Sequence, residues 1–490
     1  MSLYGAPPCN ENKSLKEVES MKKTLSLLLV ILMCIAAFAA CSQPAADSSP
    51  NTEPEQSEAS QAPADESPAA GTEIYFLNFK PEIAEVYTEI AAAYEQETGV
   101  KVKVETAAAG TYEATLKSEI AKADAPTIFQ INGPVGYQTW KDYCLDLSDS
   151  ELYNMLSDKS LAVTSGDGVF GIPYAVEGYG IIYNNAVMNK YFALDGAVAK
   201  SMDEINSFDK LKAVVEDMQA KKGDLGIEGV FASTSLLSGE DWRWQTHLAN
   251  VPMYYEFSEN TAYDNSILAG LATQNIEFKY SNNFKNIFDL YLNNAVSEKG
   301  VLGNISVNDS MAEFALGKCA MVQNGNWGAS QILGVEGNTV ADADIKFLPI
   351  YTGMPGEENQ GLCIGTENFF CINSQVSANK QKASMDFLVW LFSSDKGKAF
   401  VKDSLGFIAP FNTFSDAEKP TDPLAKEVLA WMAKDGVQTV PWTFASFPSQ
   451  EFKNAFGAAL LEYANGTKTW DDVVKIVKES WSSEWANVNS

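Results

Sequence analysis

The chain has 490 residues, of which 46% are hydrophobic, and it carries a formal net charge of −29. This length is enough for two domains with their own cores, at roughly 100–200 residues per domain. The acidic excess disfavours nucleic acid and strongly anionic ligands, whereas a cationic ligand stays compatible with it.

Residues 21–41 have the parts of a secretory signal. Two lysines precede an apolar run, and small residues then lead directly into Cys41. The apolar run is shorter than the roughly 20 residues that a membrane span needs. The junction resembles the bacterial lipoprotein lipobox, which implies that residues 21–40 are a cleaved signal peptide and that Cys41 is lipidated. An ordinary cleaved signal with an incidental cysteine is the alternative.

The segments on either side of this signal differ from the rest of the chain. Residues 1–20 precede a second methionine, Met21, and do not look like a targeting signal, so we expect an over-called N-terminus. Residues 42–70 are rich in Ser, Pro, Ala and acidic residues and lack Lys, Arg and aromatic residues. Such a segment cannot bury enough apolar surface to fold, and we expect 41–71 to be a disordered acidic tether behind the lipidated cysteine.

Beyond the tether, strand and helix patterns alternate. The expected elements are a strand at 73–78, a helix from about 83 to Gly99, a strand at 100–104, a helix at about 111–122 and a strand at 126–131. This order predicts an α/β fold with a parallel sheet and right-handed crossovers.

The remaining segments extend the α/β pattern. We expect a second unit of the same kind to begin at 178–184 and a helix to follow at 207–222. Further helices are expected at 380–393, 449–463 and 470–483, the last with Thr469 and Asp472 in capping-box spacing.

Several chemistries find little support, and we expect no cofactor and no metal. The single histidine, His247, excludes a metal site built from several imidazoles. The GxGxxG pattern at 166–171 lacks the preceding strand and following helix of a nucleotide site. Cys363 and Cys371 could pair across a turn or stay as buried free thiols.

Three later segments carry a family resemblance. They are IPYAVEGYGIIYN at 172–184, FALGKCAMVQNGNW at 314–327 and LGFIAPF at 405–411. Together they resemble the extracytoplasmic solute-binding proteins of ABC importers, in the cluster related to the maltose-binding protein. The resemblance implies a two-lobed, type II periplasmic-binding-protein-like fold with hinge crossovers. It assigns 72–176 with about 368–407 to lobe 1, and 177–367 with about 408–490 to lobe 2.

The same resemblance implies a binding protein, not an enzyme, that takes a carbohydrate between its lobes. Sugars present apolar C–H faces to aromatic rings and hydroxyls to carboxylates and amides. The residues expected to bind the ligand are Asn78, Lys80, Gln130, Asn132, Glu177, Trp242, Trp244, Trp327, Trp442 and Phe447. The implied partners are the permease subunits of an ABC importer, and the implied state is a monomer held at the extracytoplasmic face of the membrane by its lipid anchor alone.

Alternatives remain at the level of residues and of function. Glu177 could be a salt-bridge partner at the hinge, the aromatic residues could be core, and residues 241–244 could be a surface helix. The residues around Lys80 depart from the usual family loop. A polyamine or other small-cation receptor of the same fold would also use acidic and aromatic residues. A glycosidase would need two carboxylates about 5–10 Å apart.

Overall fold

A computed structural model describes residues 72–108, 110–366 and 368–489. The expected signal peptide, Cys41 and the tether therefore lie outside the described residues. The strands are β1 (Glu73–Asn78), β2 (Lys101–Thr106), β3 (Ile128–Ile131), β4 (Val163–Ser165), β5 (Gly168–Gly171), β6 (Glu177–Asn184), β7 (Gly229–Phe231), β8 (Cys319–Gly325), β9 (Ile345–Leu348), β10 (Gln360–Gly365), β11 (Phe369–Ile372) and β12 (Gln438–Pro441).

The helices follow the strands in most connections. They are α2 (Ala84–Thr98), α3 (Tyr112–Glu119), α4 (Pro134–Trp140), α5 (Glu151–Met155), α6 (Asn185–Phe192), α7 (Phe208–Ala220), α8 (Lys222–Leu225), α9 (Ala249–Ser258), α10 (Ser266–Ala272), α11 (Ser281–Asn293), α12 (Val307–Ala315), α13 (Gly328–Leu333), α14 (Ala378–Ser393), α15 (Asp395–Ala399), α16 (Pro423–Met432), α17 (Gln450–Ala464) and α18 (Trp470–Val488). Two further segments, Arg243–Leu248 and Phe400–Ser404, are π-helical turns.

The first sheet has the order β11-β3-β1-β2. Strands β2 and β3 both run parallel to β1, and β11 joins the edge antiparallel to β3. The predicted parallel arrangement of the first three strands is therefore confirmed. The helix between β1 and β2 ends at Gly99, whose φ of 74° is the left-handed conformation that glycine adopts without strain.

The second sheet has the order β12-β10-β6-β8-β7, with β9 also paired to β6. Strand β6 is antiparallel to β8, β9 and β10. The prediction that a second parallel unit begins at this strand was therefore wrong. All eight residues of β6 are buried, and a strand covered on both faces reads as one apolar run whatever the direction of its partners.

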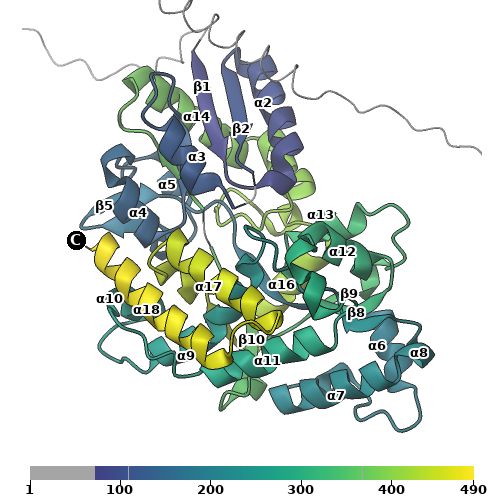
Figure 1. Cartoon of the computed structure of the whole chain (residues 1–490). Coiled ribbons are helices and arrows are strands. Elements are labelled where there is room, and N and C mark those ends of the chain that lie inside the picture. The colour runs from purple at the N-terminus through teal and green to yellow at the C-terminus, as the bar shows by residue number, and fades with distance from the viewer. Residues whose placement is uncertain (1–71, 109, 367, 490) are drawn as a thin grey trace, which may run out of the picture. The chain divides into compact units, whose positions relative to one another are not determined.

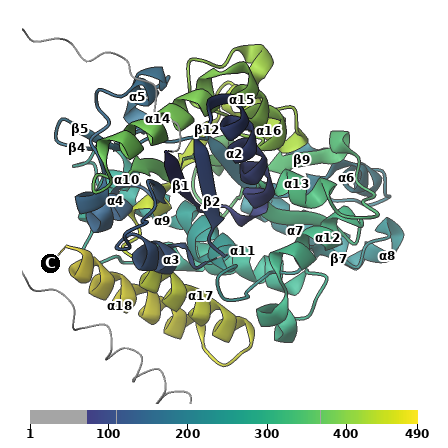
Figure 2. The same ribbon diagram turned by 90° about the horizontal axis from the view of Figure 1, so that it is seen from above.

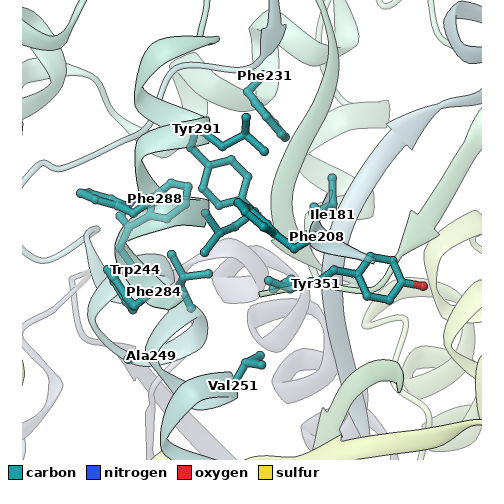
Figure 3. Packing of buried hydrophobic residues seen from close by; sticks show 14 of the residues in the cluster. Ile181, Phe208, Phe231, Trp244, Ala249, Val251, Phe284, Phe288, Tyr291 and Tyr351 are labelled. Carbon is teal, nitrogen blue, oxygen red and sulfur yellow. The ribbon is translucent and has the colours of Figure 1, made fainter. Parts of the chain in front are cut away.

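Each sheet has a core beside it. In the first, Phe76, Ile128 and Phe370 are fully buried in one cluster with residues of α2 and α14, and α2 lies along β2 in two perpendicular views (Figures 1 and 2). Figure 3 shows part of the larger core beside the second sheet. The last two helices, α17 and α18, lie side by side in Figures 1 and 2, and α18 begins with the predicted capping box between Thr469 and Asp472.

The four cysteines of the described part are buried free thiols. Cys363 lies on β10 of the second sheet and Cys371 on β11 of the first, so the free-thiol alternative holds for this pair. Within residues 72–108, 110–366 and 368–489, no helix combines the length and apolar character needed to cross a bilayer.

Candidate ligand-binding cavity

A cavity of about 420 Å³ opens between the loops of the two sheets. One side comes from the loops after β1, β2 and β3 and from α3, at the carboxyl ends of parallel strands where α/β folds place ligands. The other side comes from the segment 239–247, the start of α12, residues near α13, Phe444 and α17. The charged, amide and ring-nitrogen side chains of the lining are Lys80, Glu82, Glu113, Asn132, Glu240, Asp241, Trp242, Arg243, Gln245, His247, Asn308, Trp327, Gln331, Gln450 and Lys453.

Segment 241–248 contributes the largest share of the polar lining. Trp242, Arg243, Gln245 and His247 all line the cavity. Trp244 faces the opposite way: its indole N–H donates to the Ser235 carbonyl at 2.7 Å, and its ring lies in the core beside Tyr291 and Phe288 (Figure 3). The π-helical turn that begins at Arg243 therefore presents one tryptophan to the cavity and the other to the core.

Arg243 is the only arginine of the chain, and its side chain is almost fully buried at the cavity. Its Cζ lies 3.9 Å from the centroid of the Trp242 ring, so the guanidinium stacks on that indole. The Arg243 Nε–H donates to Asn324 Oδ1 at 3.2 Å. Burial lowers the pKa of Arg243 to about 9, while the carboxylates of Glu240 and Glu82 act to raise it, and the group stays charged at neutral pH.

Trp327 stands next to this stack. Its ring centroid is 5.9 Å from that of Trp242 and 5.6 Å from that of His247, and the three form what we call the aromatic wall. The indole folds back over Gly325, where a Cβ would come within 2.2 Å of the ring. The missing side chain of Gly325 therefore allows Trp327 its position beside the cavity.

Lys80 lines the cavity from the first sheet, but its charge is already engaged. Its Nζ lies 3.0 Å from Glu177 Oε1 and 3.7 Å from Glu82 Oε1, and 5.5 Å above the Trp327 ring. Glu177 is buried behind Lys80 and is not part of the cavity lining. Burial raises the pKa of Glu177, and the Lys80 ammonium offsets part of that rise. The structure thus gives Glu177 the salt-bridge partner that the sequence left open.

The other expected residues divide between the cavity and its support. Asn132 lines the cavity. Asn78 and Gln130 are buried behind it and hold the loop that carries Lys80: the Asn78 amide donates to the Lys80 carbonyl at 2.7 Å, and Gln130 Oε1 accepts the Phe79 N–H at 2.7 Å. Trp442 and Phe447 are both 2% exposed and lie outside the lining, Phe447 against Trp481 in the core.

Four lining residues carry a buried polar atom with no hydrogen-bond partner among the described residues. These atoms are Gln245 Oε1, His247 Nε2, Trp327 Nε1 and Gln331 Oε1. His247 Nδ1 lies 3.3 Å from the Trp242 carbonyl, which only accepts, and 3.0 Å from Thr246 Oγ1. Because the Thr246 hydroxyl donates to that same carbonyl, we assign the ring proton to Nδ1, which leaves Nε2 as an acceptor. Burial and the nearby Arg243 charge lower the pKa of His247 well below its usual value, which keeps the imidazole neutral.

Sequence reasoning missed Arg243, Gln245, His247 and Gln331. The sequence does contain one signal for Arg243 and His247. They are the only arginine and the only histidine of the chain, and they lie four positions apart beside Trp242. Gln245 and Gln331 have no such signal, since an amide in a helical turn is compatible with any surface position.

At one place the two sides of the cavity touch through backbone alone. A Cβ on Gly110 would lie 2.6 Å from the Cα of Gly239, and both glycines have positive φ, 70° and 86°. Only a residue without a side chain fits at 110 while the loops after β2 and before segment 241–248 are this close.

Comparisons with known proteins agree with this architecture. The family model described as bacterial extracellular solute-binding protein matches residues 89–427. The raffinose complex of the solute-binding protein RafE and a chitin oligosaccharide binding protein are each 16% identical with a TM-score of 0.64; they cover 84% and 85% of this chain and 100% and 99% of their own. Maltose-bound MalE3 of T. maritima is 13% identical over 84% of this chain and all of its own, with a TM-score of 0.62. A search of curated proteins gives no match. The expected α/β periplasmic-binding-protein fold is confirmed.

Proposed function

The chain belongs to the bacterial extracellular solute-binding protein family, a family of receptors and not of enzymes, and from that premise we propose that its cavity binds a carbohydrate for delivery to an ABC importer. The observation that carries the proposal is the set of unpaired polar atoms on the lining. The indole N–H of Trp327 is a donor, whereas Gln245 Oε1, His247 Nε2 and Gln331 Oε1 are acceptors. Hydroxyl groups both donate and accept, so sugar hydroxyls can pair with the donor and with the acceptors alike.

The shape and the aromatic residues support the same class of ligand. A volume of about 420 Å³ lies within the range of roughly 300–1,000 Å³ typical of small-molecule sites. Trp327 and His247 offer ring surface for the C–H faces of a sugar, whereas one face of Trp242 is already covered by Arg243. A polyamine receptor fits less well, because protonated amines only donate and would leave the indole N–H of Trp327 without an acceptor.

The proposed contact residues are Lys80, Asn132, Trp242 and Trp327, joined by Gln245, His247 and Gln331. Asn78, Gln130 and Glu177 are proposed to hold these contacts in position. A screen of neutral oligosaccharides and spermidine by thermal shift would test the ligand class, because a ligand of the native state raises the melting temperature by mass action. Stabilisation by spermidine and by no sugar would contradict the proposal.

The role of Trp327 is tested by Trp327→Ala. Loss of a central aromatic contact typically costs roughly 2 kcal/mol or more, which is more than about tenfold in affinity. We expect that loss in calorimetry with the best sugar of the screen. Trp485→Ala is the matched control, because Trp485 is a half-buried tryptophan on α18 outside the cavity lining. Equal affinity of both variants, with Trp327→Ala folded, would argue against a contact at Trp327.

The anchor and the two lobes are further parts of the proposal. Cys41 would carry the lipid, and Cys41→Ala would then release the protein from membranes or leave an uncleaved precursor, read by fractionation and mass. Lobe 1 would hold the first sheet and lobe 2 the second, and each sheet draws its strands from the segments expected for that lobe. A tight ligand that leaves the solution-scattering profile unchanged would argue against hinge closure.

A further inference from the structure

Resting on the proposed carbohydrate function, we propose that the ligand is an acidic carbohydrate whose carboxylate binds Arg243, as the uronate unit of an oligosaccharide would. This carboxylate would bind Arg243 in addition to the hydroxyl contacts proposed above.

The first step is the state of the guanidinium. Arg243 is 4% exposed and lines the cavity, yet no carboxylate oxygen of the described residues lies within 4.0 Å of it. Its hydrogen bonds go to neutral acceptors, Asn324 Oδ1 at 3.2 Å and the Glu240 carbonyl at 3.4 Å. An arginine has five N–H donors, so most of this fork has no partner among the described residues.

The second step is that the acidic side chains of the cavity are engaged elsewhere. Glu240 Oε2 accepts the Val307 N–H at 2.6 Å, at the start of α12, and Glu113 Oε2 accepts the indole N–H of Trp140 at 3.1 Å. Glu82 lies 3.7 Å from Lys80 Nζ. Glu240 and Glu82 are near enough to raise the pKa of Arg243, but none of the three carboxylates forms an ion pair with it among the described residues.

The carboxylate of Asp241 forms no ion pair with the guanidinium either. It packs against Gly457 of α17, where a Cβ would lie 1.7 Å from Asp241 Oδ2. A buried charge without a contacting counter-ion is costly, and a carboxylate on the ligand would supply that counter-ion. The strongly negative net charge of the whole protein acts at long range, whereas this contact would be made inside the cavity.

The third step is orientation. The guanidinium plane is fixed by the Trp242 ring on one side and by Asn324 at Nε, and the Arg243 backbone carbonyl accepts the Gln323 amide at 2.7 Å. A planar fork held in this way fits the two oxygens of a carboxylate, which a lysine ammonium does not match. All other basic residues of the chain are lysines, and its one arginine is placed here.

The test compares matched ligands by calorimetry: a galacturonic acid trisaccharide, its methyl ester and the neutral galactose trisaccharide, with the glucose-based series and a sugar phosphate beside them. We expect at least one acid to bind about tenfold or more tightly than its ester, since charge-assisted hydrogen bonds are clearly stronger than neutral ones. Arg243→Gln should remove that preference, Arg243→Lys should keep only part of it, and Lys212→Gln on the exposed face of α7 should keep all of it.

A second measurement needs no variant. Phenylglyoxal modifies arginine, and Arg243 is the only one, so the mass gain of the peptide that contains it reports this residue. The acidic sugar should protect Arg243 at about tenfold lower concentration than its ester.

The outcomes separate this inference from the proposed function. Neutral sugars that bind as well as every acid, or an Arg243→Gln variant that weakens both equally, would overturn the carboxylate while leaving the carbohydrate receptor intact. Tight binding of the sugar phosphate but of no uronate would also overturn it. Binding of spermidine and of no sugar would remove both conclusions.

Discussion

Two buried cations line the same cavity and are treated differently by the fold. Lys80, on the side of the first sheet, has Glu177 at 3.0 Å and Glu82 at 3.7 Å. Arg243, on the side of the second sheet, has a tryptophan face and neutral oxygen acceptors. The protein itself neutralises the first charge, whereas it orients the second and leaves it available. Equal burial of a charge therefore does not mean an equal role: the carboxylate partner distinguishes a structural ion pair from a binding group.

The largest expected effect is on the paired side. Glu177→Gln removes the closest carboxylate of the buried Lys80 ammonium, and breaking a buried pair typically costs roughly 3–5 kcal/mol of folding stability. Urea unfolding of the variant would measure this. The double variant Lys80→Met with Glu177→Leu should recover most of the loss, since replacing both partners by apolar groups is often nearly neutral. A single variant within about 1 kcal/mol of the wild type would show that the pair is not structural.

The next effect concerns Asp241, the acidic residue two positions before Arg243. Burial raises the pKa of Asp241 from 3.8 to about 6, so the ionised form is disfavoured in the folded protein. Asp241→Asn should therefore stabilise the fold at pH 7, by about 1–3 kcal/mol. In the wild type, the native state takes up this proton as the pH falls from about 6 towards 3.8, so Asp241 alone makes stability rise over that window. Denaturant melts at several pH values should show a flatter profile for the variant.

A smaller effect tests how Arg243 is held. Trp242→Phe keeps a ring under the guanidinium but weakens the cation–π contact. We expect the free energy of unfolding to fall by about 0.5–1 kcal/mol. Arg243 should also react faster with phenylglyoxal, because it is less firmly oriented. Unchanged stability together with an unchanged labelling rate would show that Asn324 alone positions the side chain.

The smallest effect is a titration shift. The Arg243 charge contributes to the low pKa of His247, behind the larger effect of burial. Arg243→Gln should therefore raise the pKa of His247. The single histidine makes its ring proton easy to follow by NMR. Because the folded pKa is lowered, His247 reduces stability as the pH falls below about 6.5, where the unfolded chain takes up the proton first. This is opposite to the effect of Asp241.

The elements with a clear period could be predicted from sequence. Helix α2, with buried Tyr87, Ile90 and Tyr94 at helical spacing, and the strands around it follow from local patterns. The direction of β6 could not, because its partners β8, β9 and β10 arrive from distant parts of the chain. Local patterns fix an element, whereas pairing depends on contacts that no window of sequence contains.

The cavity shows the same limit at the level of side chains. Lys80, Asn132, Trp242 and Trp327, four of the residues expected to bind the ligand, line it. Trp244 does not, because a single step along the π-helical turn moves the ring from the cavity to the core. Arg243 was overlooked because what distinguishes it is that no carboxylate of the described residues forms an ion pair with it. That depends on which residues surround it in the folded structure, and the sequence does not show this.

The four buried cysteines of the described residues can report how fast the folded protein opens locally. Burial raises the pKa of Cys363 to about 12 and the pKa of Cys319 and Cys371 well above the usual range, so little of the reactive thiolate forms at these three sites in the native state. Alkylation must then wait for each site to open. Cys144 and Cys371 pack in the same small core of the first sheet, whereas Cys319 and Cys363 lie on strands of the second. Labelling rates read peptide by peptide would therefore time the opening of the two sheets separately.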